Sequence, residues 1–186
     1  MKTELIKDIL TSQPDGRTVT VCGWVRTMRD SKNLVFIQVN DGSCFASIQL
    51  THDRSNPAAN ADAAAIDKTL ATVTTGASVR ATGKLIASPA SGQAVEVTLE
   101  TLAVLGTCPT DSYPLQKKAT SMEFLRENAH LRARTNTFGA VFRMRSQMAF
   151  ALHTFFQERG FFYINTPEIT CSDAEGAGEM FQVTTL

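Results

Sequence analysis

Five short segments with the two-residue periodicity of β-strands, interrupted once by a helix-forming stretch, constrain the fold of this 186-residue chain most strongly. The strands are expected at residues 18–28, 34–39, 44–50, 78–86 and 94–105. In the first, apolar and polar residues alternate, and Gly23 within it predicts a bulge or sharp bend. Turn-forming residues at 40–43 separate the second strand from the third, and a loop at 88–92 joins the last two.

The helix-forming stretch, residues 56–71, is rich in alanine and has Pro57 near its start, where proline fits a helix. Three strands, a helix and two further strands follow the element order of an OB-fold. This five-stranded barrel often binds single-stranded nucleic acid on its second and third strands. We therefore expect an all-β OB-fold barrel with one helix, spanning residues 1–105.

Cationic and aromatic residues occur where such a barrel would bind nucleic acid. Arg26 and Arg29 flank the end of the first strand, Lys32 follows, and Phe36 lies in the second strand. Single-strand binding needs a π-face to stack a base and cations to hold phosphate. Phe36 stands between two aliphatic residues, so alternation places it on the face opposite both. From the residues alone, base stacking and core packing are equal alternatives for Phe36.

Charge distribution is more informative than net charge, since 18 basic residues balance 18 acidic ones. Residues 117–145 contain seven basic side chains, opposed only by Glu123 and Glu127. Such an excess can attract phosphate, but a solvated helix face is an equal interpretation.

Several classes of protein are disfavoured by the sequence. The four cysteines are scattered without a C-x-x-C pair, so no zinc pattern is expected. Charged residues interrupt any signal-peptide core at the N-terminus, and no apolar run approaches the ~20 residues that span a bilayer. We expect a soluble, cytoplasmic protein without a membrane partner.

A second segment follows a proline-containing linker at residues 106–119 and occupies residues 120–186. A capping box from Thr120 to Glu123 predicts a short helix to about residue 128. Apolar residues at helical spacing predict a long helix over 138–156, ended by Gly160. Its apolar stripe suits either a core or a dimer interface. Residues 161–164 are expected to form a short buried strand, and Pro167 interrupts the run that follows.

Several sequence runs resemble the asparaginyl-tRNA synthetase family, in the aspartyl, asparaginyl and lysyl subgroup of class II synthetases. The helix, strand and proline of residues 138–167 resemble class II motif 1. The other runs are Gly23-Trp24-Val25-Arg26 with Arg29-Asp30, Tyr113-Pro114-Leu115, Phe124-Leu125-Arg126-Glu127, Ala129-His130-Leu131-Arg132 and Glu175-Gly176-Ala177-Gly178-Glu179-Met180-Phe181.

The resemblance implies roles for matched positions. Phe36 would stack on an anticodon base, Arg26 and Arg29 would hold the anticodon loop, and Gln49 and Glu96 would help read base edges. Glu175 would belong to a mobile loop over the amino-acid pocket, and Pro167 would lie at a dimer interface. Residues 120–186 would form the α+β opening of the catalytic domain.

The resemblance also implies an activity for the full-length protein. It would be an asparagine–tRNA ligase of protein biosynthesis, a homodimer that uses ATP and Mg²⁺ to join asparagine to tRNA(Asn). The ATP-binding motifs 2 and 3 are absent up to Leu186, so we expect a fragment without catalytic residues. Neither ATP nor Mg²⁺ is expected to bind this fragment, and we expect it to be inactive in adenylation.

Three alternatives stay open at this point. The chain could be a freestanding OB-fold module that binds nucleic acid, which the absence of motifs 2 and 3 from a longer reading frame would favour. It could come from an aspartyl or non-discriminating synthetase, which amino-acid activation by the full-length protein would decide. It could also be a structural dimerisation domain, favoured by a lack of tRNA binding at low salt.

Overall fold

The computed structural model describes residues 2–56, 62–115, 120–167, 169 and 184–185. These residues fall into two compact units, residues 1–141 and residues 142–186. The division of the chain at the linker 106–119, with domains at 1–105 and 120–186, stays a prediction.

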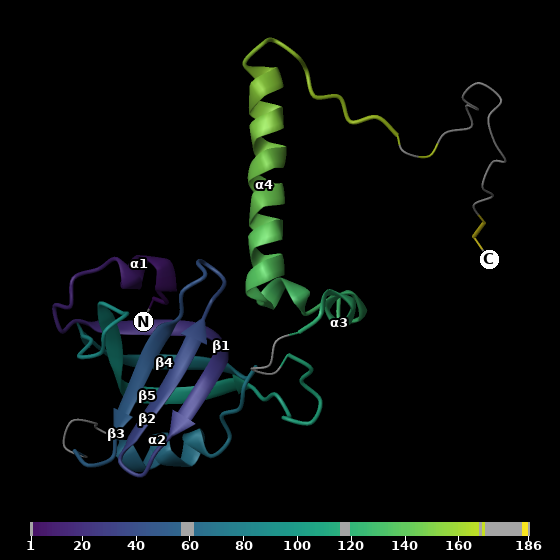
Figure 1. Cartoon of the computed structure of the whole chain (residues 1–186). Helices are drawn as coiled ribbons and strands as arrows, with labels where there is room; N and C mark the ends of the chain where they lie inside the picture. The colour runs from purple at the N-terminus through teal and green to yellow at the C-terminus, as the bar shows by residue number, and fades with distance from the viewer. Residues whose placement is uncertain (1, 57–61, 116–119, 168, 170–183, 186) are drawn as a thin grey trace. The chain divides into compact units, whose positions relative to one another are not determined.

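Five strands form a closed barrel in the order β1-β2-β3-β5-β4. Their bounds are β1 Thr18–Asp30, β2 Leu34–Asn40, β3 Ile48–Asp53, β4 Ser78–Ala87 and β5 Val95–Gly106. Neighbours are antiparallel except β3 and β5, which run parallel. Figure 1 shows these strands crossing around a common interior. The element order and the closed barrel confirm the predicted OB-fold. A helical segment begins after the barrel.

Aliphatic side chains fill the barrel, and two short helices contribute to the same core. Helix α1 (Ile6–Leu10), which the sequence analysis did not predict, buries Ile6 and Ile9 completely. Helix α2 (Ala63–Leu70) buries Ile66 and Leu70. The two helices lie at opposite ends of the barrel in Figure 1, so each covers one opening.

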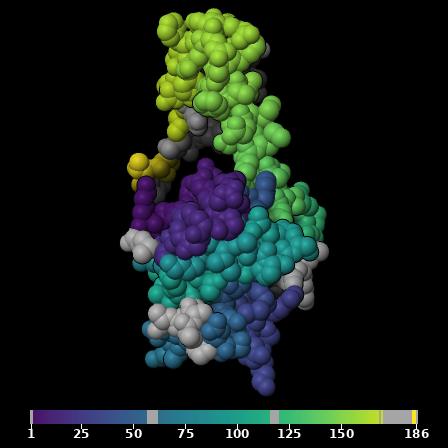
Figure 2. All heavy atoms as spheres, turned by 90° about the vertical axis from the view of Figure 1, so that its left-hand side faces the viewer, coloured from purple at the N-terminus to yellow at the C-terminus, as the bar shows by residue number. Residues whose placement is uncertain are grey.

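The N-terminal segment is attached to the barrel wall by backbone hydrogen bonds. The Glu4 amide donates to the Thr20 carbonyl, and the Gly16 amide donates to the Leu85 carbonyl. Figure 2 shows the purple atoms of this segment lying against the teal atoms of the region around β4 and β5.

Strand β1 belongs to two halves of the barrel. Residues 18–24 pair with β4, and residues 24–30 pair with β2. The bulge predicted at Gly23 lies elsewhere, because the register with β2 shifts between Val25 and Thr27. Gly23 is needed for a different reason: an added Cβ would lie 2.7 Å from the Asn40 carbonyl oxygen. The prediction of a bulge at Gly23 was therefore wrong, and the close approach of the Asn40 backbone was not predicted.

One predicted element start was wrong. Strand β3 begins at Ile48 instead of residue 44, because the Asn40 amide donates to the carbonyls of Cys44 and Ala46 and organises a loop there. Helix α2 begins at Ala63 with Asp62 as its N-cap, whose carboxylate accepts from the Ala65 amide. The start predicted near Pro57 lies outside the described residues.

Helix α3 (Met122–Glu127) begins one residue later than its predicted cap implied. Ser121, instead of Thr120, accepts a hydrogen bond from the Phe124 amide at 3.2 Å. A short 3-10 turn, Arg132–Arg134, separates α3 from the long helix α4, Asn136–Gln157.

The end of α4 is capped as predicted. Gly160 adopts φ +81°, and the Phe161 amide donates to the Phe156 carbonyl. The short buried strand predicted at residues 161–164 is not found. These residues have no regular secondary structure, and Phe162 is 91% exposed. No strand among the described residues pairs with them, so their apolar character alone does not make them a strand.

Candidate nucleic-acid interface

The outer face of β1, β2 and β3 carries aromatic, cationic and amide side chains in register. Phe36 is opposite Arg29 on one side and Thr51 on the other, and Gln38 is opposite Thr27 and Gln49. Directly opposed residues of antiparallel strands project from the same face of a sheet. These six residues therefore share one face, which we call the β1–β3 face.

Phe36 lies on this outer face and not in the core. Its neighbours Val35 and Ile37 are completely buried in the barrel, whereas Phe36 is half-buried. Core packing, one of the two alternatives that the sequence left open, therefore does not describe Phe36. The part of its ring that solvent reaches is available to stack a planar group.

Glu96, on β5, is the centre of a polar network at the edge of the β1–β3 face. The residue is 5% exposed. Its Oε2 accepts hydrogen bonds from Gln49 Nε2 at 3.1 Å, from Ser88 Oγ at 3.0 Å and from Gln93 Nε2 at 3.3 Å. The structure therefore brings Gln49 and Glu96 together, although they are 47 residues apart in sequence. Their role in reading base edges stays a prediction.

Ser88 and Gln93 are polar residues of this network that the sequence analysis missed. Both lie in the connection between β4 and β5, which was predicted only as a loop. They also contact each other, with Gln93 Nε2 3.1 Å from Ser88 Oγ. No local sequence signal connects them to Gln49, because all three residues meet only at Glu96, and Gln49 reaches Glu96 through the parallel pairing of β3 with β5.

Arg26 is the extra residue of the β1 bulge, between Val25 and Thr27. Its guanidinium donates to the Arg134 carbonyl at 2.8 Å and to the Asn136 side-chain oxygen at 3.2 Å. The Arg134 guanidinium in turn lies over the Trp24 ring, 4.8 Å from its centroid. The structure therefore attaches Arg26 to residues 134–136 and leaves Arg29 on the β1–β3 face, so the two predicted cations have different surroundings.

The loop after Arg29 is held by a cation that the sequence analysis also missed. Arg54 donates to both carboxylate oxygens of Asp30 and, through Nε at 2.7 Å, to Asp67 on α2. The hydrogen bond from Arg54 lowers the pKa of the Asp30 carboxyl below its ordinary value. The same bonds to Asp30 and Asp67 raise the pKa of Arg54. Two carboxylates thus compensate the Arg54 charge, whereas the exposed Arg29 keeps its charge available beside Phe36.

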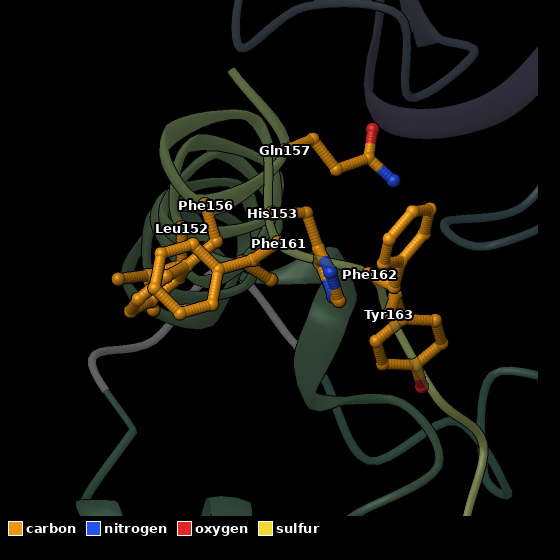
Figure 3. Close-up of a pocket in the computed structure, with 8 residues that line it drawn as sticks. Leu152, His153, Phe156, Gln157, Phe161, Phe162 and Tyr163 are labelled. Atoms are coloured by element: carbon orange, nitrogen blue, oxygen red, sulfur yellow. The ribbon is translucent and has the colours of Figure 1, made fainter. Parts of the chain in front are cut away.

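The second unit presents an uncovered apolar surface. A hollow of about 420 Å³ is lined by α4 and the residues after it. Figure 3 shows Leu152, Phe156 and Phe161 gathered together, with His153, Phe162 and Tyr163 beyond them. The His153 and Tyr163 rings meet edge to face, with centroids 4.8 Å apart. Of the long apolar stripe predicted on this helix, Phe138 is buried and the later members are exposed.

Two predicted site residues remain, Pro167 and Glu175. Pro167 is exposed and has no regular secondary structure. Glu175 lies outside the described residues. Within the described ranges, no helix has both the length and the apolar character needed to cross a membrane.

Within the described residues, no group of side chains fits ATP or Mg²⁺. The part of the chain that the structure describes contains no group of three or more His, Cys, Asp or Glu side chains placed to hold a metal ion. The hollow on α4 is lined mainly by apolar side chains, which cannot compensate the charge of a triphosphate. A second hollow, of about 260 Å³ beside Trp24, contains no basic side chain.

Two family models match the chain in succession. An OB-fold nucleic acid binding domain matches residues 19–105, and a model of tRNA synthetases class II (D, K and N) matches residues 121–186. The two matches lie on either side of the predicted linker, residues 106–119.

Curated relatives match nearly the whole chain. The asparagine–tRNA ligase of Treponema denticola is 61% identical over 98% of this chain, and that of Nitratidesulfovibrio vulgaris is 52% identical over 100%. The matches cover 38% and 39% of those two proteins, respectively. The chain therefore spans well under half the length of these relatives.

Solved structures share the fold. Asparaginyl-tRNA synthetase from Pyrococcus horikoshii matches 89% of this chain and 38% of its own, with a TM-score of 0.75 and 18% identity. The Entamoeba histolytica enzyme matches 88% of this chain and 38% of its own, with a TM-score of 0.69 and 21% identity. The two family models and the curated relatives show that the chain corresponds to the N-terminal region of asparagine–tRNA ligases, an OB-fold nucleic acid binding domain followed by the start of a class II (D, K and N) synthetase domain.

Proposed function

We propose that this chain binds the anticodon loop of tRNA(Asn) on the β1–β3 face of its barrel. The observation that carries the proposal is the half-buried Phe36 opposite the exposed Arg29, on the outer side of a closed OB-fold. The family match to a nucleic acid binding barrel over residues 19–105 supports it.

Each predicted residue supplies a different part of the interaction. Phe36 offers a ring on which an unpaired base stacks, and Arg29 offers a cation for the adjacent phosphate. Gln49 can donate and accept, whereas an ionised Glu96 can only accept. A base with a donor at the matching position satisfies Glu96, and a base with an acceptor there leaves buried polar groups unpaired.

Arg26 can contact RNA only if its present hydrogen bonds change. Its guanidinium is engaged by residues 134–136, so contact with RNA requires those hydrogen bonds to be shared or exchanged. The Arg29 guanidinium makes no such hydrogen bonds within the described part of the chain and is exposed, so we propose it as the principal phosphate contact.

We propose that the protein to which this region belongs attaches asparagine to tRNA(Asn) during protein synthesis in the cytoplasm. The curated relatives are asparagine–tRNA ligases, and the Pyrococcus horikoshii enzyme has been solved with asparaginyl-adenylate. ATP would supply the activation of asparagine, with Mg²⁺ neutralising phosphate charge. We propose that the described part contributes tRNA selection. Glu175, which lies outside the described residues, is proposed for the amino-acid pocket.

We also propose that α4 and Pro167 form part of a homodimer interface. Large apolar residues of α4 are exposed, among them Met148, Leu152 and Phe155. An unpartnered apolar surface of this kind on a soluble domain marks an interaction site.

Titration of a labelled tRNA(Asn) anticodon stem-loop with the chain, at one fixed salt concentration, tests the tRNA proposal. Phe36→Ala should weaken binding by roughly 1–3 kcal/mol, because one base–aromatic stack is lost. Phe45→Ala is the matched control, since Phe45 is 51% exposed but lies in the connection between β2 and β3. Unchanged affinity for Phe36→Ala would remove the ring from the interface.

A different measurement distinguishes a ligase region from the alternative, a freestanding nucleic-acid-binding module. A protein of this family that contains the whole synthetase domain should catalyse asparagine-dependent pyrophosphate exchange, and exchange with aspartate instead would indicate a different amino-acid specificity. Exchange by the 186-residue chain alone would refute the expectation that it is inactive in adenylation.

A further inference from the structure

The connection between β4 and β5 supplies two of the three hydrogen bonds that hold the Glu96 carboxylate. We propose that Ser88 and Gln93 are positioning residues, which orient Glu96 for base recognition without needing to touch RNA themselves. This inference rests on the proposed anticodon binding and names two residues that would influence which base is recognised.

The three donors to Glu96 converge on one of its two oxygens. Gln49, Ser88 and Gln93 all donate to Oε2, at 3.0 to 3.3 Å. Among the described residues, none donates a hydrogen bond to Oε1, although Glu96 is only 5% exposed. An ionised carboxylate accepts at both oxygens, so the network leaves Oε1 with capacity for one more donor.

Because Glu96 is buried, its carboxylate depends on these hydrogen bonds. A carboxylate removed from water must be hydrogen-bonded to remain ionised at low cost. Without donors from the connection between β4 and β5, the Glu96 side chain would be free to rotate toward solvent. It would then cease to be a fixed acceptor. Ser88 and Gln93 thus maintain the rotamer of Glu96.

The connection is itself braced, so that its donors are held in place. The Ser88 amide donates to the Ala94 carbonyl at 3.0 Å, which closes the loop at its base. Ser88 Oγ also accepts from the Ala90 amide and from Gln93 Nε2. Ser88 therefore links the loop backbone, Gln93 and Glu96 in one set of bonds.

The ligand chemistry follows from the remaining acceptor. An N–H donor on the edge of an unpaired base, such as an exocyclic amino group or a protonated ring nitrogen, matches Glu96 Oε1. An oxygen acceptor at the same position would be repelled. The positioning residues should therefore affect discrimination at a single base of the loop more than overall affinity.

The test uses the 186-residue chain with Ser88→Ala, Gln93→Ala and Ser91→Ala, the last as a control at an exposed serine of the same loop. Each is titrated against anticodon stem-loops of tRNA(Asn) in which one anticodon base at a time is replaced. A double-mutant cycle combines Gln93→Ala with Glu96→Gln. Thermal unfolding of every variant reports whether the fold is retained.

We expect Ser88→Ala and Gln93→Ala to weaken binding of the cognate stem-loop by about two- to tenfold, the cost of ordering a side chain that was previously fixed. The loss should be concentrated at the base position to which Glu96→Gln is also sensitive. It should shrink when Glu96 is already replaced. Ser91→Ala should bind like the unsubstituted chain.

Two results overturn the inference in distinguishable ways. If the unsubstituted chain binds but Gln93→Ala gives the same loss with and without Glu96, the two residues do not act together and the positioning role is wrong. Unchanged binding and discrimination in folded Ser88→Ala and Gln93→Ala would have the same meaning. If the unsubstituted chain binds no stem-loop, the proposed function fails as well.

Discussion

Arg26 and Arg29 lie three positions apart on β1, yet the structure gives them different surroundings. Arg26 donates to the Arg134 carbonyl and to Asn136, whereas Arg29 is exposed opposite Phe36. A guanidinium that already has protein acceptors contributes to stability as well as to any RNA contact. The number of nearby arginines is therefore a poor measure of the number of phosphate contacts.

This difference yields a prediction at the residue scale. Arg29→Ala should reduce the slope of log K against log salt concentration by about 0.7, the value for one phosphate contact on a single strand. Its free energy of unfolding should not change. Arg26→Ala should instead lower the free energy of unfolding by about 1 kcal/mol, because two hydrogen bonds are lost.

Stem-loop titrations over a range of salt concentrations, together with urea unfolding, measure both quantities on the same pair of variants. If the slope of log K against log salt concentration is the same in Arg29→Ala as in the unsubstituted chain, the Arg29 charge does not reach the RNA backbone. Full stability in Arg26→Ala would show that its bonds to residues 134–136 are dispensable.

At the scale of elements, β1 depends on close backbone approach. Gly23→Ala should destabilise the barrel by roughly 1–3 kcal/mol, because the added Cβ would lie 2.7 Å from both the Asn40 carbonyl oxygen and Val39 Cγ1. Urea unfolding measures the change, with Thr101→Ala at an exposed position of β5 as the control. A Gly23→Ala chain as stable as the parent would mean that β1 and β2 separate here without cost.

Local pattern predicted most of the elements, for identifiable reasons. The alternation around Phe36 placed it correctly opposite the buried neighbours, because strand side chains repeat with a period of two. Strands β4 and β5 were predicted to within one residue, since the loop at 88–92 separates them clearly. The start of β3 was missed because the Asn40 side chain, and not the local pattern, organises the residues before it.

The candidate site was less predictable than the fold. Gln49 and Glu96 were identified by resemblance, but their meeting requires the parallel pairing of β3 and β5. Ser88 and Gln93 have ordinary loop composition and gain significance only through the buried carboxylate between them. The bonds of Arg54 to Asp30 and Asp67 likewise join segments that no sequence period connects.

At the scale of the whole molecule, the exposed stripe on α4 predicts self-association. Leu152 is 57% exposed and lines the hollow in Figure 3. Burial of such side chains against a second copy would be favourable by about 25 cal/mol per Å² of apolar surface. Leu152→Asp should therefore shift the chain toward monomer.

Sedimentation velocity over a range of concentrations measures this shift. Gln147→Asp, at an exposed polar position of the same helix, introduces the same charge as a control and should leave association unchanged. A parent chain that stays monomeric at high concentration would argue against the proposed homodimer.

The alternation on β2 has a consequence for how such a barrel changes over generations. Val35, Ile37 and Val39 maintain the scaffold from inside, while Phe36 and Gln38 are presented outside on the same seven-residue strand. Mutations can consequently change the outward-facing side chains while the inward-facing ones stay constant. A lineage that acquires a new preference for a nucleotide therefore need not change the packing of the barrel interior.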